Sequence, residues 1–175
     1  MLRFADTAPF RLRPLFTSPT RSLVRDDISA FARTLQRTVE RIREASGAEQ
    51  VDIVGHSMGG IVAAHYINHT GGVGIVRRLV TLGTPWKGTT MHILGFGRQC
   101  HGLAPGSKEV VQATPVAAPV TALWSRTDAI ILPTGNATFE GARSVELTNQ
   151  GHVSMLFSLQ TMRAVEAALS HGGEE

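Results

Sequence analysis

Apolar positions recur at helical spacing in the first long periodic segment of the chain. Asp26 or Asp27 can cap the start of this segment, and Gly47 marks its end. Its apolar positions fall on one face of a helix, and they are Ile28, Phe31, Leu35, Val39 and Ile42. The pattern therefore predicts an amphipathic helix between the aspartates and Gly47.

Short apolar runs bounded by turn residues predict strands. They cover residues 51–54, 76–82, 120–124 and 144–147, and residues 10–15 alternate like one more strand. Helical patterns over 58–69 and 153–169 alternate with these strands. In the closing helix, the side chains expected to face inward are Leu156, Leu159, Met162, Val165 and Leu169.

This alternation of strands and helices implies an α/β fold, with a mostly parallel sheet flanked by helices. Catalytic or binding groups are then expected at the carboxyl ends of the strands. The length of 175 residues fits a single domain that spans residues 1–175. Residues 86–115 are rich in Gly, Pro and Thr and show no clear periodicity. Because a loop this long usually has a function of its own, we expect a lid or a substrate-site loop there.

The composition narrows the function classes. Hydrophobic residues make up 42% of the chain and charged residues 18%, which is ordinary for a soluble globular protein. The net charge of +3 is small, and no run of like charges indicates a nucleic-acid partner. A lone cysteine, Cys100, excludes an internal disulfide framework. Neither a transmembrane run nor a secretory signal is predicted, so the chain as written is expected in the cytoplasm.

A G-x-S-x-G motif lies between a predicted strand and a predicted helix. It consists of Gly55, His56, Ser57, Met58 and Gly59. In this setting the serine sits on a sharp turn known as a nucleophile elbow, and Gly55 and Gly59 are expected to leave room for the strand and helix to cross. The backbone N–H of Met58, at the helix start, is expected to donate to the oxyanion of a tetrahedral intermediate.

A serine nucleophile needs a base, and in an elbow of this kind the acid and then the histidine follow in chain order. Asp128 and His152 each follow a predicted strand, in that order. Either residue alone resembles a turn or cap residue, but together they predict a triad. His152 would accept the proton of Ser57, and Asp128 would orient the imidazole. His65 and His69 lie four apart on one helix without a third ligand nearby, so no metal site is predicted.

Four segments resemble bacterial lipases and esterases of the α/β-hydrolase superfamily. They are GHSMGG at 55–60, VTLGTPWKGT at 80–89, ALWSRTDAIILP at 122–133 and GH at 151–152. The resemblance, to triacylglycerol lipases in particular, implies hydrolysis of carboxylic esters, usually acylglycerols or other fatty-acyl esters, without a cofactor. Its implied partner is a small-molecule ester or a lipid substrate.

In such lipases the segment after LGTP lines or covers the acyl site, and the acid follows a W-S-x-x-D-like strand end. The resemblance thus implies a role for the loop that follows Trp86 and supports Asp128 as the acid. Apolar side chains around the loop are candidates for substrate binding, namely Trp86, Met91, Ile93, Leu94 and Phe96. The alternative is that these side chains pack the loop onto the core, and both interpretations stay open.

One departure from the family concerns the N-terminal part. Family members open with two or three strands, and a His-Gly-containing loop after the first of them supplies the second oxyanion-hole donor. No His-Gly pair precedes Ser57, and only one strand and one helix are predicted before the elbow strand. The sequence therefore predicts an α/β-hydrolase fold that lacks its first strands, through either an N-terminal truncation or a start codon assigned too far downstream. A longer N-terminus would then carry any secretion signal.

Three other interpretations stay open. The chain could be an inactive remnant or a non-catalytic acyl-binding or partner-binding module of the same fold. It could be a thioesterase or an acyltransferase that uses the same three residues. It could also be half of a split enzyme that a complementing N-terminal chain completes.

Overall fold

A computed structural model of the chain describes residues 2–4, 27–91 and 102–170. Within these residues, five strands form one sheet in the order β1-β2-β3-β4-β5. Their bounds are Leu2–Phe4 (β1), Val51–His56 (β2), Val76–Leu82 (β3), Val120–Trp124 (β4) and Arg143–Glu146 (β5). Strands β2 to β5 are mutually parallel, and β1 pairs with β2 in the antiparallel sense. The predicted α/β class with a mostly parallel sheet is confirmed.

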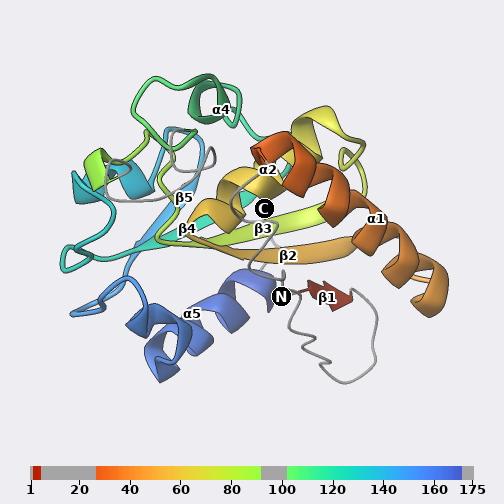
Figure 1. The fold of residues 1–175 in the computed structure, drawn as a ribbon. Helices are drawn as coiled ribbons and strands as arrows, with labels where there is room; N and C mark the ends of the chain where they lie inside the picture. The colour runs from red at the N-terminus through yellow and green to blue at the C-terminus, as the bar shows by residue number, and fades with distance from the viewer. Residues whose placement is uncertain (1, 5–26, 92–101, 171–175) are drawn as a thin grey trace.

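Helices cover both faces of this sheet (Figure 1). Helices α1 and α2 lie on one face, and α5 lies on the other. The helices are α1 (Ile28–Ser46), α2 (Met58–His69), α4 (Lys108–Val111) and α5 (Leu159–Ser170), with short 3-10 helices η2 (Thr134–Ala137) and η3 (Ser154–Leu156). The predicted ends of the first helix are confirmed. The Asp27 side chain accepts the N–H of Ala30 at 2.8 Å, and Gly47 adopts a left-handed conformation with φ of 70°.

Two clusters of buried apolar side chains fill the space between the layers. The larger cluster joins β2 and β3 to α1 and α2, and it includes the predicted α1 positions Ile28, Phe31 and Val39. The smaller cluster lies under α5, and it consists of Val80, Leu82, Leu123, Leu147, Met155, Ala168 and Leu169. The sheet is thus buried on both faces, as parallel sheets usually are.

The closing helix begins later than the sequence predicts. Residues 154–156 form the 3-10 turn η3, and α5 starts only after Ser158, whose carbonyl accepts the N–H of Met162 at 3.0 Å. This interruption breaks the continuous helical periodicity that the prediction assumed. Leu156, Leu159 and Met162 are therefore exposed rather than inward, which makes that part of the prediction wrong. Only the end of the predicted stripe, at Leu169, is fully buried.

Two further differences lie outside the parallel strands. The antiparallel strand β1 was not predicted, and the strand predicted at 10–15 lies outside the described residues. The loop predicted at 86–115 contains the short helix α4, which Ser107 caps by accepting the N–H of Val110 at 3.3 Å. Among the described residues, no helix is both long and apolar enough to cross a membrane.

Candidate active site

Ser57 occupies the turn that joins β2 to α2. Its backbone has φ of 54° and ψ of −129°, a conformation that residues other than glycine rarely adopt. Its N–H donates to the carbonyl of Leu82 at the end of β3, at 2.9 Å. Its carbonyl accepts the hydroxyl of Thr84 at 2.9 Å and the N–H of Gly60 at 3.1 Å. The sharp turn is therefore held in place by the end of the neighbouring strand.

Two glycines let the strand and helix approach each other at this turn. A Cβ on Gly55 would lie 2.8 Å from the backbone nitrogen of Gly60, and a Cβ on Gly60 would lie 2.2 Å from Thr84 Oγ1. A Cβ on Gly59 would meet nothing within 4 Å in the described part of the chain. The prediction is thus confirmed for Gly55 and wrong for Gly59, because Gly60 makes the close contact.

Alanine substitutions at Gly59 and Gly60 are expected to have different effects on the stability of the protein. Gly60→Ala forces the Thr84 side chain away from the Ser57 carbonyl, and we expect a loss of about 1–3 kcal/mol in the free energy of unfolding. Gly59→Ala adds a methyl group in open space and should raise the free energy of unfolding by no more than about 1 kcal/mol. Urea unfolding of both variants checks this, and equal losses would contradict the described crowding.

The loops after β4 and β5 bring a buried acid and a histidine together. Asp128 Oδ2 lies 2.7 Å from His152 Nδ1, and both side chains are buried. Asp128 Oδ1 accepts the backbone N–H groups of Ile130 and Ile131 at 2.8 and 3.0 Å. Burial alone would raise the pKa of Asp128. The hydrogen bonds from His152 and from the two backbone N–H groups outweigh burial, so the pKa lies below its usual value. The carboxylate is therefore ionised at neutral pH.

Gly83, directly after β3, lies against this pair. Its φ is 52°, and a Cβ there would lie 2.9 Å from Asp128 Oδ2 and 3.1 Å from His152 Nδ1. Only glycine satisfies both the backbone conformation and the space. Because Ser57 is bonded to Leu82, the residue before Gly83, the turn and the acid–histidine pair share the carboxyl edge of the sheet.

His56 links the elbow to the histidine loop. Its Nε2 lies 2.9 Å from the carbonyl oxygen of His152, and the two rings have centroids 4.7 Å apart. Since a carbonyl only accepts, His56 Nε2 carries the donated proton. No hydrogen bond joins the Ser57 hydroxyl to His152 within the described ranges, which is common before substrate is bound.

The free energy of unfolding is expected to decrease as the pH is lowered, because of His56. Burial lowers the pKa of His56, against the opposing influence of its hydrogen bond to the His152 carbonyl. As pH falls below about 6.5, the unfolded chain binds a proton at His56 more readily than the folded chain, so stability decreases. A His56→Gln variant keeps a donor and should lose this part of the pH dependence. Urea unfolding at about pH 7 and 5.5 checks this. If the free energy of unfolding changed equally with pH in wild type and variant, the prediction would be contradicted.

Comparisons with known proteins identify the fold that carries this site. A family model described as alpha/beta hydrolase fold matches residues 16–98. The structure of Bacillus licheniformis lipase BlEst2 in its mature form superposes with a TM-score of 0.68 at 15% identity, over 82% of this chain and 75% of that chain. The chain has the α/β-hydrolase fold.

Two further solved structures share the α/β-hydrolase fold with this chain. The product of gene lin2722 from Listeria innocua gives a TM-score of 0.61 at 18% identity, over 86% of this chain and 69% of that chain. Aspergillus fumigatus lipase B gives a TM-score of 0.66 at 17% identity, over 89% of this chain but only 44% of that chain. At these identities the likeness concerns the fold.

The remaining predicted site residues lie in different environments within this α/β-hydrolase fold. Met58 is the first residue of α2, so its N–H has no partner within the helix and is free to donate. Trp86 is buried in the larger core cluster, where its indole N–H donates to Thr81 at 3.3 Å and its ring lies 4.7 Å from that of Phe139. Its surroundings are therefore those of a core residue.

Met91 is the last described residue before a gap in the described chain. It is half-buried, and its N–H donates to Thr89 Oγ1 at 3.2 Å. Ile93, Leu94 and Phe96 lie outside the described residues. The acyl-binding role of the loop at 86–115 therefore stays a prediction.

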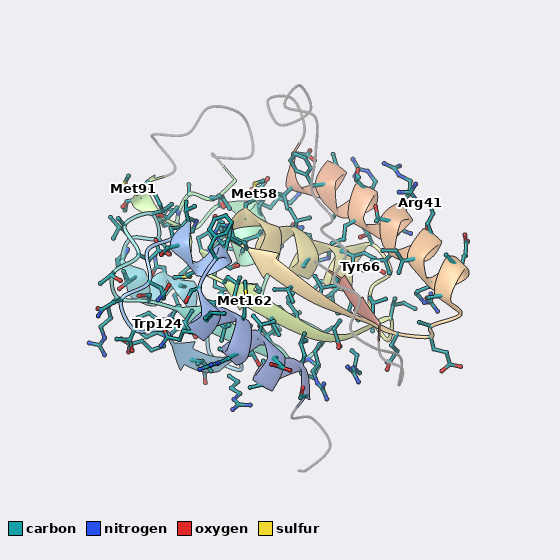
Figure 2. All side chains as sticks on the ribbon, turned by 90° about the horizontal axis from the view of Figure 1, so that it is seen from below. Arg41, Met58, Tyr66, Met91, Trp124 and Met162 are labelled. Atoms are coloured by element: carbon teal, nitrogen blue, oxygen red, sulfur yellow. The ribbon has the colours of Figure 1, made fainter. Side chains whose placement is uncertain are left out.

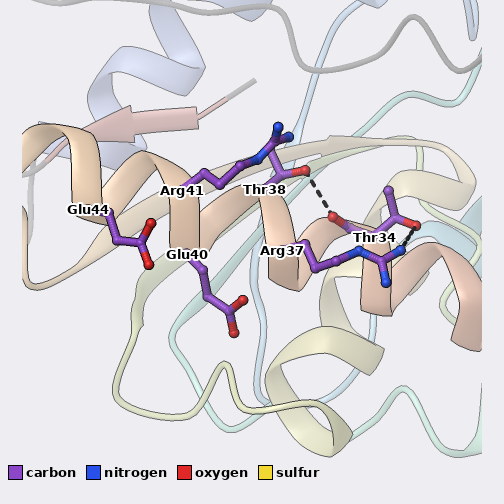
Figure 3. Close-up of a pocket in the computed structure, with 6 residues that line it drawn as sticks. All are labelled: Thr34, Arg37, Thr38, Glu40, Arg41 and Glu44. Atoms are coloured by element: carbon purple, nitrogen blue, oxygen red, sulfur yellow. Dashed lines mark hydrogen bonds between the residues drawn. The ribbon is translucent and has the colours of Figure 1, made fainter.

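Two other features, the histidine pair on α2 and a surface hollow along α1, lie apart from the candidate active site. His65 and His69 direct their Nε2 atoms at the carbonyl oxygens of Glu109 and Gln112, at 2.7 and 3.0 Å, and so fasten α2 to α4. In the described part of the chain no three metal-ligating side chains gather. The hollow in Figure 3 contains none of the predicted site residues, and its lining residues all belong to α1: Thr34, Arg37, Thr38, Glu40, Arg41 and Glu44.

Proposed function

We propose that this chain is a serine hydrolase that cleaves carboxylic esters through Ser57, His152 and Asp128. The observation that carries the proposal is the buried contact of 2.7 Å between Asp128 and His152, at the same sheet edge as the strained Ser57 turn. A structural ion pair alone would not account for a serine held in this conformation beside it. An acid, a base and a serine on a strained turn are together the groups that acyl transfer needs.

The hydrogen bonds determine which nitrogen of His152 can act as the base. The ionised Asp128 carboxylate only accepts, so His152 Nδ1 carries the proton of their hydrogen bond. His152 Nε2 is then left with a lone pair. It can accept the proton of Ser57 as the serine oxygen attacks the ester carbonyl.

The reaction then proceeds in two halves. The tetrahedral intermediate collapses to an acyl-enzyme, and His152 passes its proton to the departing alcohol. Water, deprotonated by His152, attacks the acyl-enzyme and releases the acid. During both halves the N–H of Met58 would donate to the negatively charged oxygen, which in such sites is worth about 10²–10³ in rate.

Fatty-acyl esters, including acylglycerols, are the substrate class that we propose. Two of the similar structures are of proteins named as lipases. The segments that resemble lipases include the elbow and both loops of the acid–histidine pair. The loop at 86–115 would contact the acyl chain.

Hydrolysis of p-nitrophenyl butyrate by the full chain tests this proposal. We expect release of p-nitrophenol above the buffer rate and none from p-nitrophenyl phosphate, since the site is built for an acyl carbonyl. A thioester such as butyryl-CoA serves as the comparison for the thioesterase alternative. Folded protein that hydrolyses neither acyl compound would overturn the proposal.

A further inference from the structure

Hydrogen bonds from two directions hold the loop that carries His152. From the loop after β4, Ser125 Oγ accepts the N–H of Gln150 at 3.2 Å, and the Thr127 hydroxyl donates to the Gln150 carbonyl at 3.1 Å. From the end of β2, His56 Nε2 donates to the His152 carbonyl at 2.9 Å. The histidine loop is thus bonded separately to the acid loop and to the elbow.

The bond from His56 ties the base to the nucleophile. His56 directly precedes Ser57, so the neighbour of the nucleophile is bonded to the main chain of the base itself. Between described residues, no other hydrogen bond connects residues 55–60 with residues 150–156. Without this bond, His152 would be tied to the Ser57 turn only indirectly, through the sheet.

The bond lies where the parallel strands end. His56 is the last residue of β2, and Trp124 is the last residue of β4, from which the acid loop continues. In Figure 2, Met58 and Trp124 lie toward the same side of the molecule, and Arg41 of α1 lies toward the other end. His56 is therefore placed between the elbow and the two loops of the acid–histidine pair.

The neutral imidazole of His56 suits a position beside the base. Burial lowers the pKa of His56, and the nearby His152 ring acts in the same direction, against the hydrogen bond to the His152 carbonyl and the charge of Asp128. His152 gains a positive charge while Ser57 attacks in the proposed mechanism, and a second cation would oppose that charge with the ring centroids only 4.7 Å apart. A neutral donor holds His152 without this opposition.

We propose that His56 is a positioning residue, whose hydrogen bond to the His152 carbonyl aligns the imidazole of His152 for proton transfer from Ser57. This role rests on the hydrolase function proposed above, whereas the hold of His56 on the histidine loop requires no catalysis. Loss of the bond should leave the Asp128–His152 contact in place, because Ser125 and its neighbours join those two loops independently. It should move the pair relative to Ser57.

Hydrolysis of p-nitrophenyl butyrate by full-length variants tests the role of the donor. His56→Leu removes the donor and should lower kcat by about 10–10²-fold with little change in KM, since alignment affects the chemical step. His56→Gln keeps a neutral N–H donor and should recover most of that loss. Gln50→Leu is the matched control. Gln50 donates to the carbonyl of Gly74 at 3.0 Å, just before the start of β2, and its replacement should leave kcat unchanged.

Amide hydrogen exchange of residues 148–157, followed by mass spectrometry, provides a readout that is independent of hydrolysis. His56→Leu should speed exchange in this segment, including that of the Met155 N–H, which donates to the Gly151 carbonyl at 3.2 Å. His56→Gln and Gln50→Leu should exchange like the wild-type chain. Equal exchange in all four proteins would overturn the proposal, whether or not the chain cleaves esters.

The remaining outcomes separate this proposal from the hydrolase function. Circular dichroism verifies folding, and His56→Met, which also lacks a donor, replaces His56→Leu if that variant does not fold. A folded His56→Leu variant with wild-type kcat overturns the positioning role and leaves the hydrolase function intact. Equal losses of kcat in His56→Leu and His56→Gln also overturn it, because the donated hydrogen bond would then not matter. Faster exchange in His56→Leu, in a chain whose wild type cleaves no ester, overturns the hydrolase function and supports the hold of His56 on His152.

Discussion

Replacing Ser57 by alanine is expected to lower kcat for ester hydrolysis by roughly 10⁴–10⁶-fold and to leave the chain folded. The substitution removes the oxygen that attacks the ester carbonyl in the proposed mechanism. The hydroxyl makes no hydrogen bond to any described residue, while the backbone bonds of Ser57 to Leu82 and Thr84 do not depend on the side chain. We therefore expect catalysis to be lost without a comparable loss of stability.

Steady-state kinetics with p-nitrophenyl butyrate, together with urea unfolding, checks this expectation. Ser46→Ala is the control, since Ser46 lies at the end of α1, where its hydroxyl donates to the carbonyl of Ile42 at 2.7 Å. A Ser57→Ala variant with more than about a tenth of wild-type kcat would mean that another residue is the nucleophile.

Replacing Asp128 by asparagine is expected to lower kcat by roughly 10⁴-fold. An amide in this place can donate a hydrogen bond to His152 Nδ1, and the neutral imidazole then carries its own proton on Nε2. His152 would in that state be unable to accept the proton of Ser57. Asp27→Asn is the matched control, because asparagine caps a helix as well as aspartate does and α1 should keep its start.

The same substitution has an expected effect on the stability in acid. The pKa of Asp128 is lower in the folded chain than in the unfolded chain, so its contribution to stability is present above the unfolded value of about 3.9. That contribution is lost as pH falls through the folded value. Asp128→Asn should therefore be less stable than wild type at neutral pH, and the difference should shrink in acid. Urea unfolding at about pH 7 and pH 3.5 measures it, and a difference that grows in acid would contradict the direction of the pKa shift.

Local features of the sequence predicted most of the regular structure. The α1 helix could be placed because Asp27 and Gly47 act as caps through bonds to residues within one turn. The strands β3 and β4 and the helix α2 have the predicted bounds, since turn residues border each of them. The Ser57 turn was recognisable because its glycines and serine are adjacent in sequence. Asp128 and His152 could be proposed only because their order after successive strands is fixed by the fold.

Contacts between segments distant in sequence could not be predicted. The close approach at Gly60 depends on Thr84, which is 24 residues away, and the bond from His56 to the His152 carbonyl spans 96 residues. The LGTP motif contains Gly83 and Thr84. The motif alone does not predict that Gly83 lies against the acid–histidine pair or that Thr84 donates to the Ser57 carbonyl.

Burial was the property that periodicity predicted least well. Trp86 was a candidate for the acyl channel because it begins a long loop, yet its ring packs against Phe139 in the core. The stripe that includes Leu159 and Met162 was expected to face inward, but the helix starts anew after Ser158 and leaves them exposed. The strand predicted at residues 10–15 stays a prediction, because residues 5–26 lie outside the described structure.

Labelling with a fluorophosphonate, followed by peptide mass spectrometry, tests the central claim most directly. This reagent forms a stable adduct only with a serine that a neighbouring base activates. We predict a single adduct on Ser57 in the wild-type chain and its loss in a folded His152→Ala variant. No adduct on the folded wild-type chain, an adduct on another residue, or equal labelling of Ser57 without His152 would contradict the proposed mechanism.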